Sequence, residues 1–212
     1  MIHPSLATRL RPFVLALTAL LVLPVCAQPK NAPATYATLL AQLKSGDTHI
    51  DYARLRLSYP DSPEYKSAPD TTADQKAMAA DLDSKNYASA LKHAQNVLAG
   101  EYVNIDAHFV VYVAQKQLGH DDRAAFHLAV FRGLLDSIHN SGDGLTPATA
   151  WVIISVHEEY VMLRALGFMP SQQSLLHQNG HYYDKMVVKS VEDGSEHTFY
   201  FNTDIPIKEE GF

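Results

Sequence analysis

The 212-residue sequence contains only one cysteine, and its basic residues are few and scattered. A single cysteine cannot form an intrachain disulfide or a cysteine-rich zinc site. Asp and Glu number 23 against 17 for Lys and Arg, which gives a formal net charge of −6 at pH 7. An acidic chain without a basic cluster lacks the positive charge that attracts nucleic acid and anionic membranes. We therefore expect neither as a partner.

The familiar motifs of catalysis and metal binding are also missing. Residues 157–161 read HEEYV, with Val161 where the zinc-protease motif needs a second histidine. The glycine-rich loop at 139–146 is not followed by the GK[ST] of a phosphate loop, and no G-x-S-x-G elbow occurs. The histidines show no spacing typical of three or four convergent metal ligands. The sequence therefore predicts no catalytic residue, no metal site and no cofactor.

Long apolar runs are absent except for one near the N-terminus. Residues 13–23 are apolar and follow Arg9 and Arg11, a pattern typical of a secretory signal. This run is too short to cross a bilayer as a helix. We predict that residues 1–27 form a signal peptide that is cleaved after Ala27, which leaves an exported chain, periplasmic or secreted, with no membrane span.

Cleavage after Ala27 has two consequences for the mature chain. The loss of Arg9 and Arg11 changes the formal net charge from −6 to −8, and the loss of Cys26 removes the only thiol. The alternative is a lipoprotein anchored through Cys26. Lipoprotein signals usually place a small residue directly before the cysteine, and Val25 occupies that position. We therefore favour the cleaved, unanchored form.

Most of the mature chain has the sequence pattern of helices separated by turns. Residues 28–34 form a proline-rich leader, and we expect residues 35–212 to form a single domain. An apolar stripe at helical spacing predicts a first helix from Tyr36 that ends before Gly46. The segment GDTHIDYARLRLSY, residues 46–59, follows that helix.

This charged segment is interpreted as a helix start rather than an active site. Thr48 and Asp51 have the spacing of a capping box, which would begin the next helix. Arg54 and Arg56 then point in different directions, because residues two apart do not share a helix face. They would make a poor joint anion clamp. A second capping-box spacing, from Thr71, predicts another helix that extends to about residue 84.

Residues 86–135 read as helix, turn, helix, turn and helix. Ala90 and Ala124 stand 34 residues apart, which is the period of a tetratricopeptide repeat, and Gly119 lies where that repeat turns. The match is partial, because Tyr112 and Phe131 occupy positions where the repeat has small residues. The pattern predicts tetratricopeptide-like helical hairpins.

In the C-terminal third, the sequence pattern changes from helical to strand-like. Thr146 and Pro147 suit a helix start, and we predict one largely apolar helix over residues 147–167. Residues 182–191 and 196–203 then alternate with a period of two, and the intervening Asp193-Gly194 is typical of a hairpin turn. The fold class predicted is mainly α (α+β): antiparallel helical hairpins with a C-terminal β-hairpin at about 181–205.

Three blocks of the sequence carry a resemblance to a known family. They are LLAQLKSGDTHIDYARLRLSYPDSPEY, SGDGLTPATAWVIISVHEEYVMLRALG and YYDKMVVKS…HTFYFNTDIPI. Together they resemble an exported bacterial family known as domain of unknown function 4919. The resemblance implies one exported domain over nearly the whole mature chain, and it implies no activity, cofactor or catalytic residue.

Two functions remain open at this stage. The first is a non-enzymatic binding or assembly module of the bacterial cell envelope, whose partner is a protein, either an envelope component or a second copy. The alternative is a small hydrolase or metal-dependent enzyme with an unusual His/Glu site, for which His157, Glu158 and Tyr160 are the candidate residues. The absence of every catalytic motif considered favours the first.

The N-terminal pattern makes a direct prediction about the native product. Intact-mass measurement of the protein from its own host should find a chain that begins at Gln28, because the signal peptidase cuts after Ala27. A lipidated Cys26 at the N-terminus would establish the anchored form instead. A native chain that still carries Met1 would contradict export.

Overall fold

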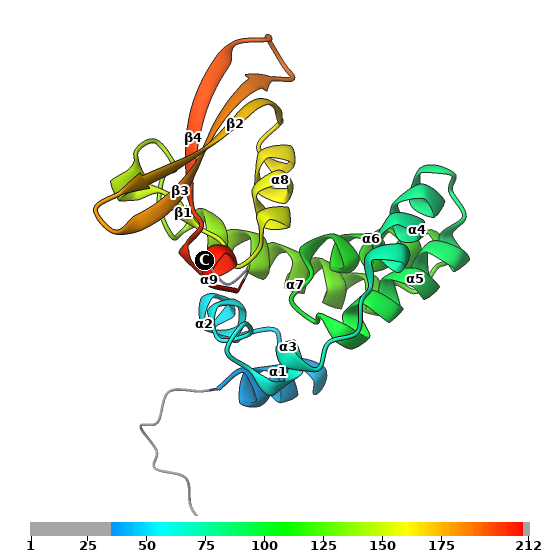
Figure 1. The fold of residues 1–212 in the computed structure, drawn as a ribbon. Coiled ribbons are helices and arrows are strands. Elements are labelled where there is room, and N and C mark those ends of the chain that lie inside the picture. Colours follow the sequence, from blue (N-terminus) through cyan, green and yellow to red (C-terminus); the bar gives the residue numbers. More distant parts are fainter. Residues whose placement is uncertain (1–34, 210–212) are drawn as a thin grey trace, which may run out of the picture. The chain divides into compact units, whose positions relative to one another are not determined.

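The computed structural model describes residues 35–209, so the predicted signal peptide, the leader and Cys26 lie outside the described residues (Figure 1). Its helices are α1 (Tyr36–Lys44), α2 (Tyr52–Leu57), α3 (Pro63–Lys66), α4 (Thr72–Asp83), α5 (Tyr87–Gly100), α6 (Ile105–Gln117), α7 (Asp121–His139), the 3₁₀ turn η1 (Pro147–Thr149), α8 (Val156–Ala165) and α9 (Asp204–Glu209). Its strands are β1 (Trp151–Val152), β2 (Phe168–Gln178), β3 (His181–Ser190) and β4 (Glu196–Asn202). The α+β class predicted from the sequence is confirmed. No helix within residues 35–209 has the length and apolar character needed to cross a membrane.

The first two helices confirm the prediction with one correction. Helix α1 buries Leu39 and Leu43, and Gly46 follows it with a positive φ of 98°. Helix α2, however, begins at Tyr52 and is capped by Asp51, which accepts a hydrogen bond of 2.8 Å from the Arg54 amide. The predicted cap, Thr48, lies outside the helix because an Asp47 turn, closed by the His49 amide at 2.9 Å, occupies that part of the chain.

Helices α4 to α7 follow one another along the chain, and each packs on the next (Figure 1). Helix α4 occupies the segment predicted from Thr71, although the Thr71 side chain forms no cap hydrogen bond. Ala90 of α5 and Ala124 of α7, which the 34-residue period relates, are both buried. Small side chains at these positions let neighbouring helices approach closely.

The sheet has the strand order β1-β4-β3-β2, with β1 parallel to β4 and the other pairs antiparallel. Strands β3 and β4 occupy the two segments predicted from period-two alternation. Asn179 and Gly180 join β2 to β3, and their φ values of 53° and 81° are those of a type I′ turn. The C-terminal ribbon is thus part of a four-stranded sheet.

The single helix predicted for residues 147–167 is wrong. That segment forms η1, β1 and the shorter helix α8. Trp151 pairs in register with Phe201 of β4, and its ring packs against that residue at 5.4 Å between centroids. The apolar run therefore joins the edge of the sheet, and the α-helix begins only after Ser155. Tertiary pairing outweighs the helical pattern here.

Strand β2 was not predicted, because its sequence FMPSQQSLLHQ shows no alternation of apolar and polar residues. Most side chains of β2 are exposed, whichever face of the sheet they lie on. A strand with little buried surface on either face has no hydrophobic pattern from which it could be recognised.

Most buried hydrophobic side chains belong to one core between the sheet and helices α1, α2, α7 and α8. Helix α2 crosses α7 at Gly133, where an added Cβ atom would lie 2.4 Å from the Tyr52 ring. This position needs glycine for close approach rather than for backbone freedom. The close contact brings Arg56 of α2 against α7.

Arg56 forms an ion pair inside this core. Its side chain is fully buried, and its Nη1 donates to the Glu158 Oε2 at 2.8 Å while its Nε donates to the Ser137 Oγ at 2.9 Å. The Glu158 carboxylate also accepts from the Ile154 amide at 2.9 Å. Burial raises the pKa of Glu158, and the charge of Arg56 opposes that rise. The pair joins α2, α7 and α8.

Loss of one partner of this pair should destabilise the protein strongly. Arg56→Met leaves the Glu158 carboxylate buried without its countercharge, at a cost of about 3–5 kcal/mol in the free energy of unfolding. The double variant Arg56→Met/Glu158→Leu should recover much of that loss, because no unpaired charge remains. Urea denaturation measures both, with the exposed Arg123→Met as control. Equal stabilities of Arg56→Met and the control would contradict the interpretation.

Candidate functional site

Four consecutive residues in the first turn of α8 include the three candidates from the sequence: His157, Glu158 and Tyr160. Successive residues of a helix point about 100° apart, so adjacent side chains meet different neighbours. Glu158 faces the core and is held by Arg56. The side chains of His157, Glu159 and Tyr160 face two other parts of the structure.

His157 lies at the surface against α6. Its Nε2 is 3.0 Å from the Asp106 Oδ2, and the Arg164 Nη2 donates to the Asp106 Oδ1 at 2.6 Å. The hydrogen bond with Asp106 raises the pKa of His157. A groove of about 590 Å³ between α4, α6 and α8 includes all three of these residues. The His157–Asp106 pair is part of a surface charge network.

Tyr160 points toward the sheet, where its hydroxyl donates to the Gln173 Oε1 at 3.0 Å. The structure therefore brings neither His157 nor Glu158 to the hydroxyl of Tyr160, since each has its own partner. The three residues named for an unusual His/Glu site do not share one reacting point. The enzymatic alternative gains no support from this arrangement.

The sequence analysis missed the residue between them, Glu159. Its side chain is fully buried beside Asp184 of β3, and Gln173 bridges the two carboxyls, donating to the Asp184 Oδ2 at 2.7 Å and to the Glu159 Oε2 at 3.4 Å. Burial, followed by the charge of Asp184, raises the pKa of Glu159 from 4.5 to about 9. Glu159 is therefore protonated at neutral pH.

The proton on Glu159 explains an otherwise unsatisfied atom. As an ionised carboxylate, Glu159 would be an acceptor only, and its buried Oε1 has no donor among the described residues. The O–H of a protonated carboxyl can donate instead, and Asp184 is the acceptor beside it. A pair of adjacent acidic residues on a helix, HEEY, was the only sequence signal for this arrangement.

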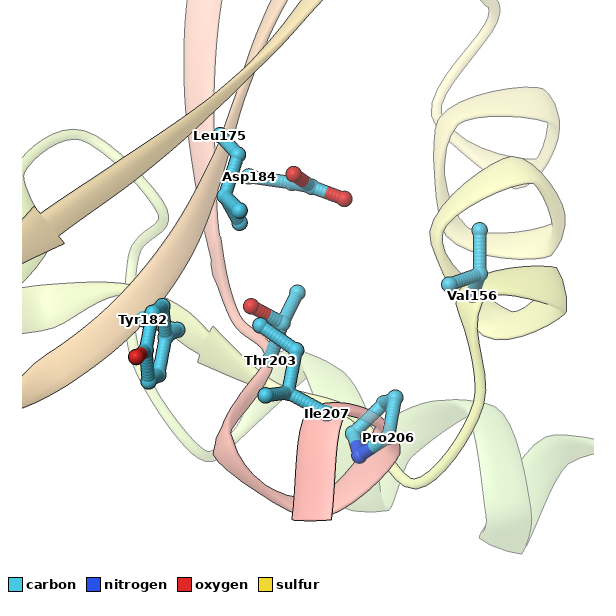
Figure 2. Close-up of a pocket in the computed structure, with 7 residues that line it drawn as sticks. All are labelled: Val156, Leu175, Tyr182, Asp184, Thr203, Pro206 and Ile207. Carbon is cyan, nitrogen blue, oxygen red and sulfur yellow. The ribbon is translucent and has the colours of Figure 1, made fainter. Parts of the chain in front are cut away.

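A cavity of about 310 Å³ opens beside this carboxyl pair (Figure 2). Figure 2 shows the Asp184 carboxylate pointing from β3 toward the side of the cavity that Val156 of α8 forms. The wall is mainly apolar, and its residues are Val156, Leu175, Tyr182, Asp184, Thr203, Pro206 and Ile207. Thr203 is buried, and its Oγ1 has no hydrogen-bond partner within residues 35–209.

The cavity wall is thus an apolar surface with one acidic group and one unpartnered hydroxyl. Sites for small molecules have this composition: an apolar lining with a few polar groups that fix orientation. No group of three or more His, Cys, Asp or Glu side chains in the described part of the chain is arranged to hold a metal ion. We take the cavity and the Glu159–Asp184 pair as the candidate site.

The raised pKa of Glu159 predicts a pH dependence of stability. Between pH 4.5 and about 9 the carboxyl is protonated in the folded chain and ionised in the unfolded chain, so folding takes up a proton. The contribution of Glu159 is fully present below pH 4.5 and is lost as the pH rises through about 9. Its slope is at most about 1.4 kcal/mol per pH unit.

Glu159→Gln removes this titration and keeps a donor toward Asp184. The free energy of unfolding of this variant, measured by urea denaturation from pH 5 to 9, should rise relative to wild type as the pH increases. The exposed Glu192→Gln is the matched control and should leave the wild-type profile unchanged. Parallel profiles for wild type and Glu159→Gln would show that Glu159 is ionised in the folded chain.

Comparison with known families places this chain. The family model described as Domain of unknown function (DUF4919) matches residues 26–211. No curated protein and no solved structure matches the chain. The match covers nearly all of the sequence, including every described helix and strand. The chain therefore belongs to the DUF4919 family, a domain of unknown function.

Proposed function

We propose that this chain is a non-enzymatic binding module of the bacterial cell envelope, and that it binds an extended segment of a partner protein along the free edge of β2. The observation that carries the proposal is the position of β2 in the sheet. It pairs with β3 on one side, and within residues 35–209 no strand pairs with its other side. The backbone N–H and C=O groups of such an edge accept an added strand.

The side chains of β2 do little to prevent strand addition. Natural sheets protect their edges with Lys, Pro, bulges or short strands. Strand β2 is 11 residues long and contains no Lys, Arg, Asp or Glu. Its protection is confined to one end, where Pro170 and a register shift before Gln172 interrupt the ladder. The rest of the strand, from Gln172 to Gln178, is regular and exposed.

Export to the cell envelope remains part of the proposal. Its support is the N-terminal pattern of Arg9, Arg11, an apolar run at 13–23 and a cleavage site after Ala27. A protein partner suits the acidic composition, since the chain has no basic cluster for nucleic acid.

We also propose that α4–α5 and α6–α7 are two tetratricopeptide-like hairpins. The support is the 34-residue spacing of Ala90 and Ala124 together with the burial of both side chains. Two such units fall short of the three or so that an independent solenoid needs. In this proposal the helices form a scaffold that packs beside the sheet, and β2 provides the contact.

The edge can be tested with a phage-displayed library of random linear peptides selected on the folded protein. The selected peptides should bind wild type and protect β2 amides from hydrogen exchange, because they pair with that strand. The variant Gln172→Lys/Ser174→Glu places charges on the edge without changing net charge. It should bind the same peptides at least about tenfold more weakly.

The matched control is Ala41→Glu/Gln42→Lys, which places the same two charges on the exposed side of α1. This variant should bind the selected peptides as wild type does. Peptides that bind the β2 variant with unchanged affinity, or that protect amides elsewhere, would contradict the proposal. A library that yields no binding peptide would do so as well.

A further inference from the structure

The candidate cavity contains a buried carboxylate that no cation neutralises. Asp184 is 7% exposed, and neither it nor Glu159 pairs with a Lys, Arg or His among residues 35–209. Glu159 holds a proton, because its pKa is raised to about 9, and it supplies no countercharge to Asp184. Buried charges in proteins are normally paired. The missing countercharge points to a positively charged ligand.

Thr203 supplies a second and independent indication. Its side chain is 2% exposed and lines the same cavity, and its Oγ1 lacks a hydrogen-bond partner in the described part of the chain. A buried polar atom without a partner is rare in native proteins. A hydroxyl can accept a hydrogen bond from the same donor group that Asp184 binds.

The apolar part of the cavity wall indicates what the apolar part of the ligand should be. Val156, Leu175, Pro206 and Ile207 provide aliphatic surface around the two polar groups. A volume of about 310 Å³ lies at the lower end of the range for small-molecule sites. The site accordingly suits a short aliphatic chain that ends in a charged donor.

We propose that this cavity binds a primary ammonium group carried on an unbranched alkyl chain. The ammonium donates to the Asp184 carboxylate, and the chain lies against Val156, Pro206 and Ile207 beside Thr203. The proposal differs from strand addition at β2, because the ammonium binds Asp184 of β3 and β2 contributes only Leu175 to the cavity wall.

The Glu159–Asp184 pair also sets the charge of the ligand. Because Glu159 holds a proton, Asp184 is the one acidic group in the cavity wall, which matches one ammonium group. Gln173 fixes the Asp184 Oδ2 by a hydrogen bond of 2.7 Å. The acceptor is thus oriented before the ligand arrives, which lowers the entropic cost of binding.

The test is a titration of the folded protein with n-hexylamine at neutral pH, followed by amide chemical shifts. Saturable shifts should appear at Asp184, Thr203 and Ile207. The probe 1-hexanol has the same chain without the charge and should bind at least about tenfold more weakly, because a hydrogen bond between charged groups is lost. Hexanoate should not bind, since its charge repels Asp184.

Two variants connect the binding to the cavity. Asp184→Asn should lose the preference for hexylamine over hexanol. Leu175→Trp should block the cavity from a position that is 61% exposed, where the larger ring leaves the core undisturbed. Met169→Trp is the matched control, because Met169 lies on the same strand, is 64% exposed and does not line the cavity. It should bind hexylamine as wild type does.

A further titration distinguishes between two sources of the ammonium group, a free amine and the lysine side chain of a peptide. If Nα-acetyl-lysine N-methylamide binds at least as tightly as hexylamine, the source is a lysyl residue; binding of hexylamine alone identifies a free amine. Equal affinity for hexylamine and hexanol would overturn the proposal. The same conclusion follows if hexylamine gives no saturable shift, or if both Trp variants weaken binding equally.

Discussion

The buried ion pair between Arg56 and Glu158 is the interaction on which the rest of this structure depends. It joins α2 to the first turn of α8 and, through Ser137, to α7. Helix α8 starts at Val156, so this pair also fixes the rotation of the turn that contains His157, Glu159 and Tyr160. The candidate cavity lies between that turn and the sheet. The geometry of the site therefore derives from a charge buried in the core.

Two adjacent glutamates on α8 are both buried, but the cost of burying their charge is met by different neighbours. Glu158 pairs with a guanidinium, whereas Glu159 pairs with no cation among residues 35–209 and holds a proton. Both outcomes follow from the same desolvation cost, and the available neighbour decides between them. The contrast explains why one residue is part of the scaffold while the other lies beside the cavity.

The sequence predicted the elements whose residues have a strong local signal. The apolar stripe from Tyr36, the cap region before α4 and the alternation in β3 and β4 all correspond to observed elements. The sequence analysis failed where contacts between distant segments determine the structure. Trp151 joins β4, which no local pattern indicates, and β2 has no buried face to create alternation. The site was missed for the same reason, because Glu159, Gln173 and Asp184 meet only in three dimensions.

Strand β1 has a consequence for the order in which the chain folds. Its only ladder partner among the described strands is β4, and Trp151 pairs there with Phe201. The sheet edge and the core around Trp151 cannot form until β4, about 50 residues further along the chain, is available for pairing. Non-local pairing of this kind makes folding slow relative to local helix formation.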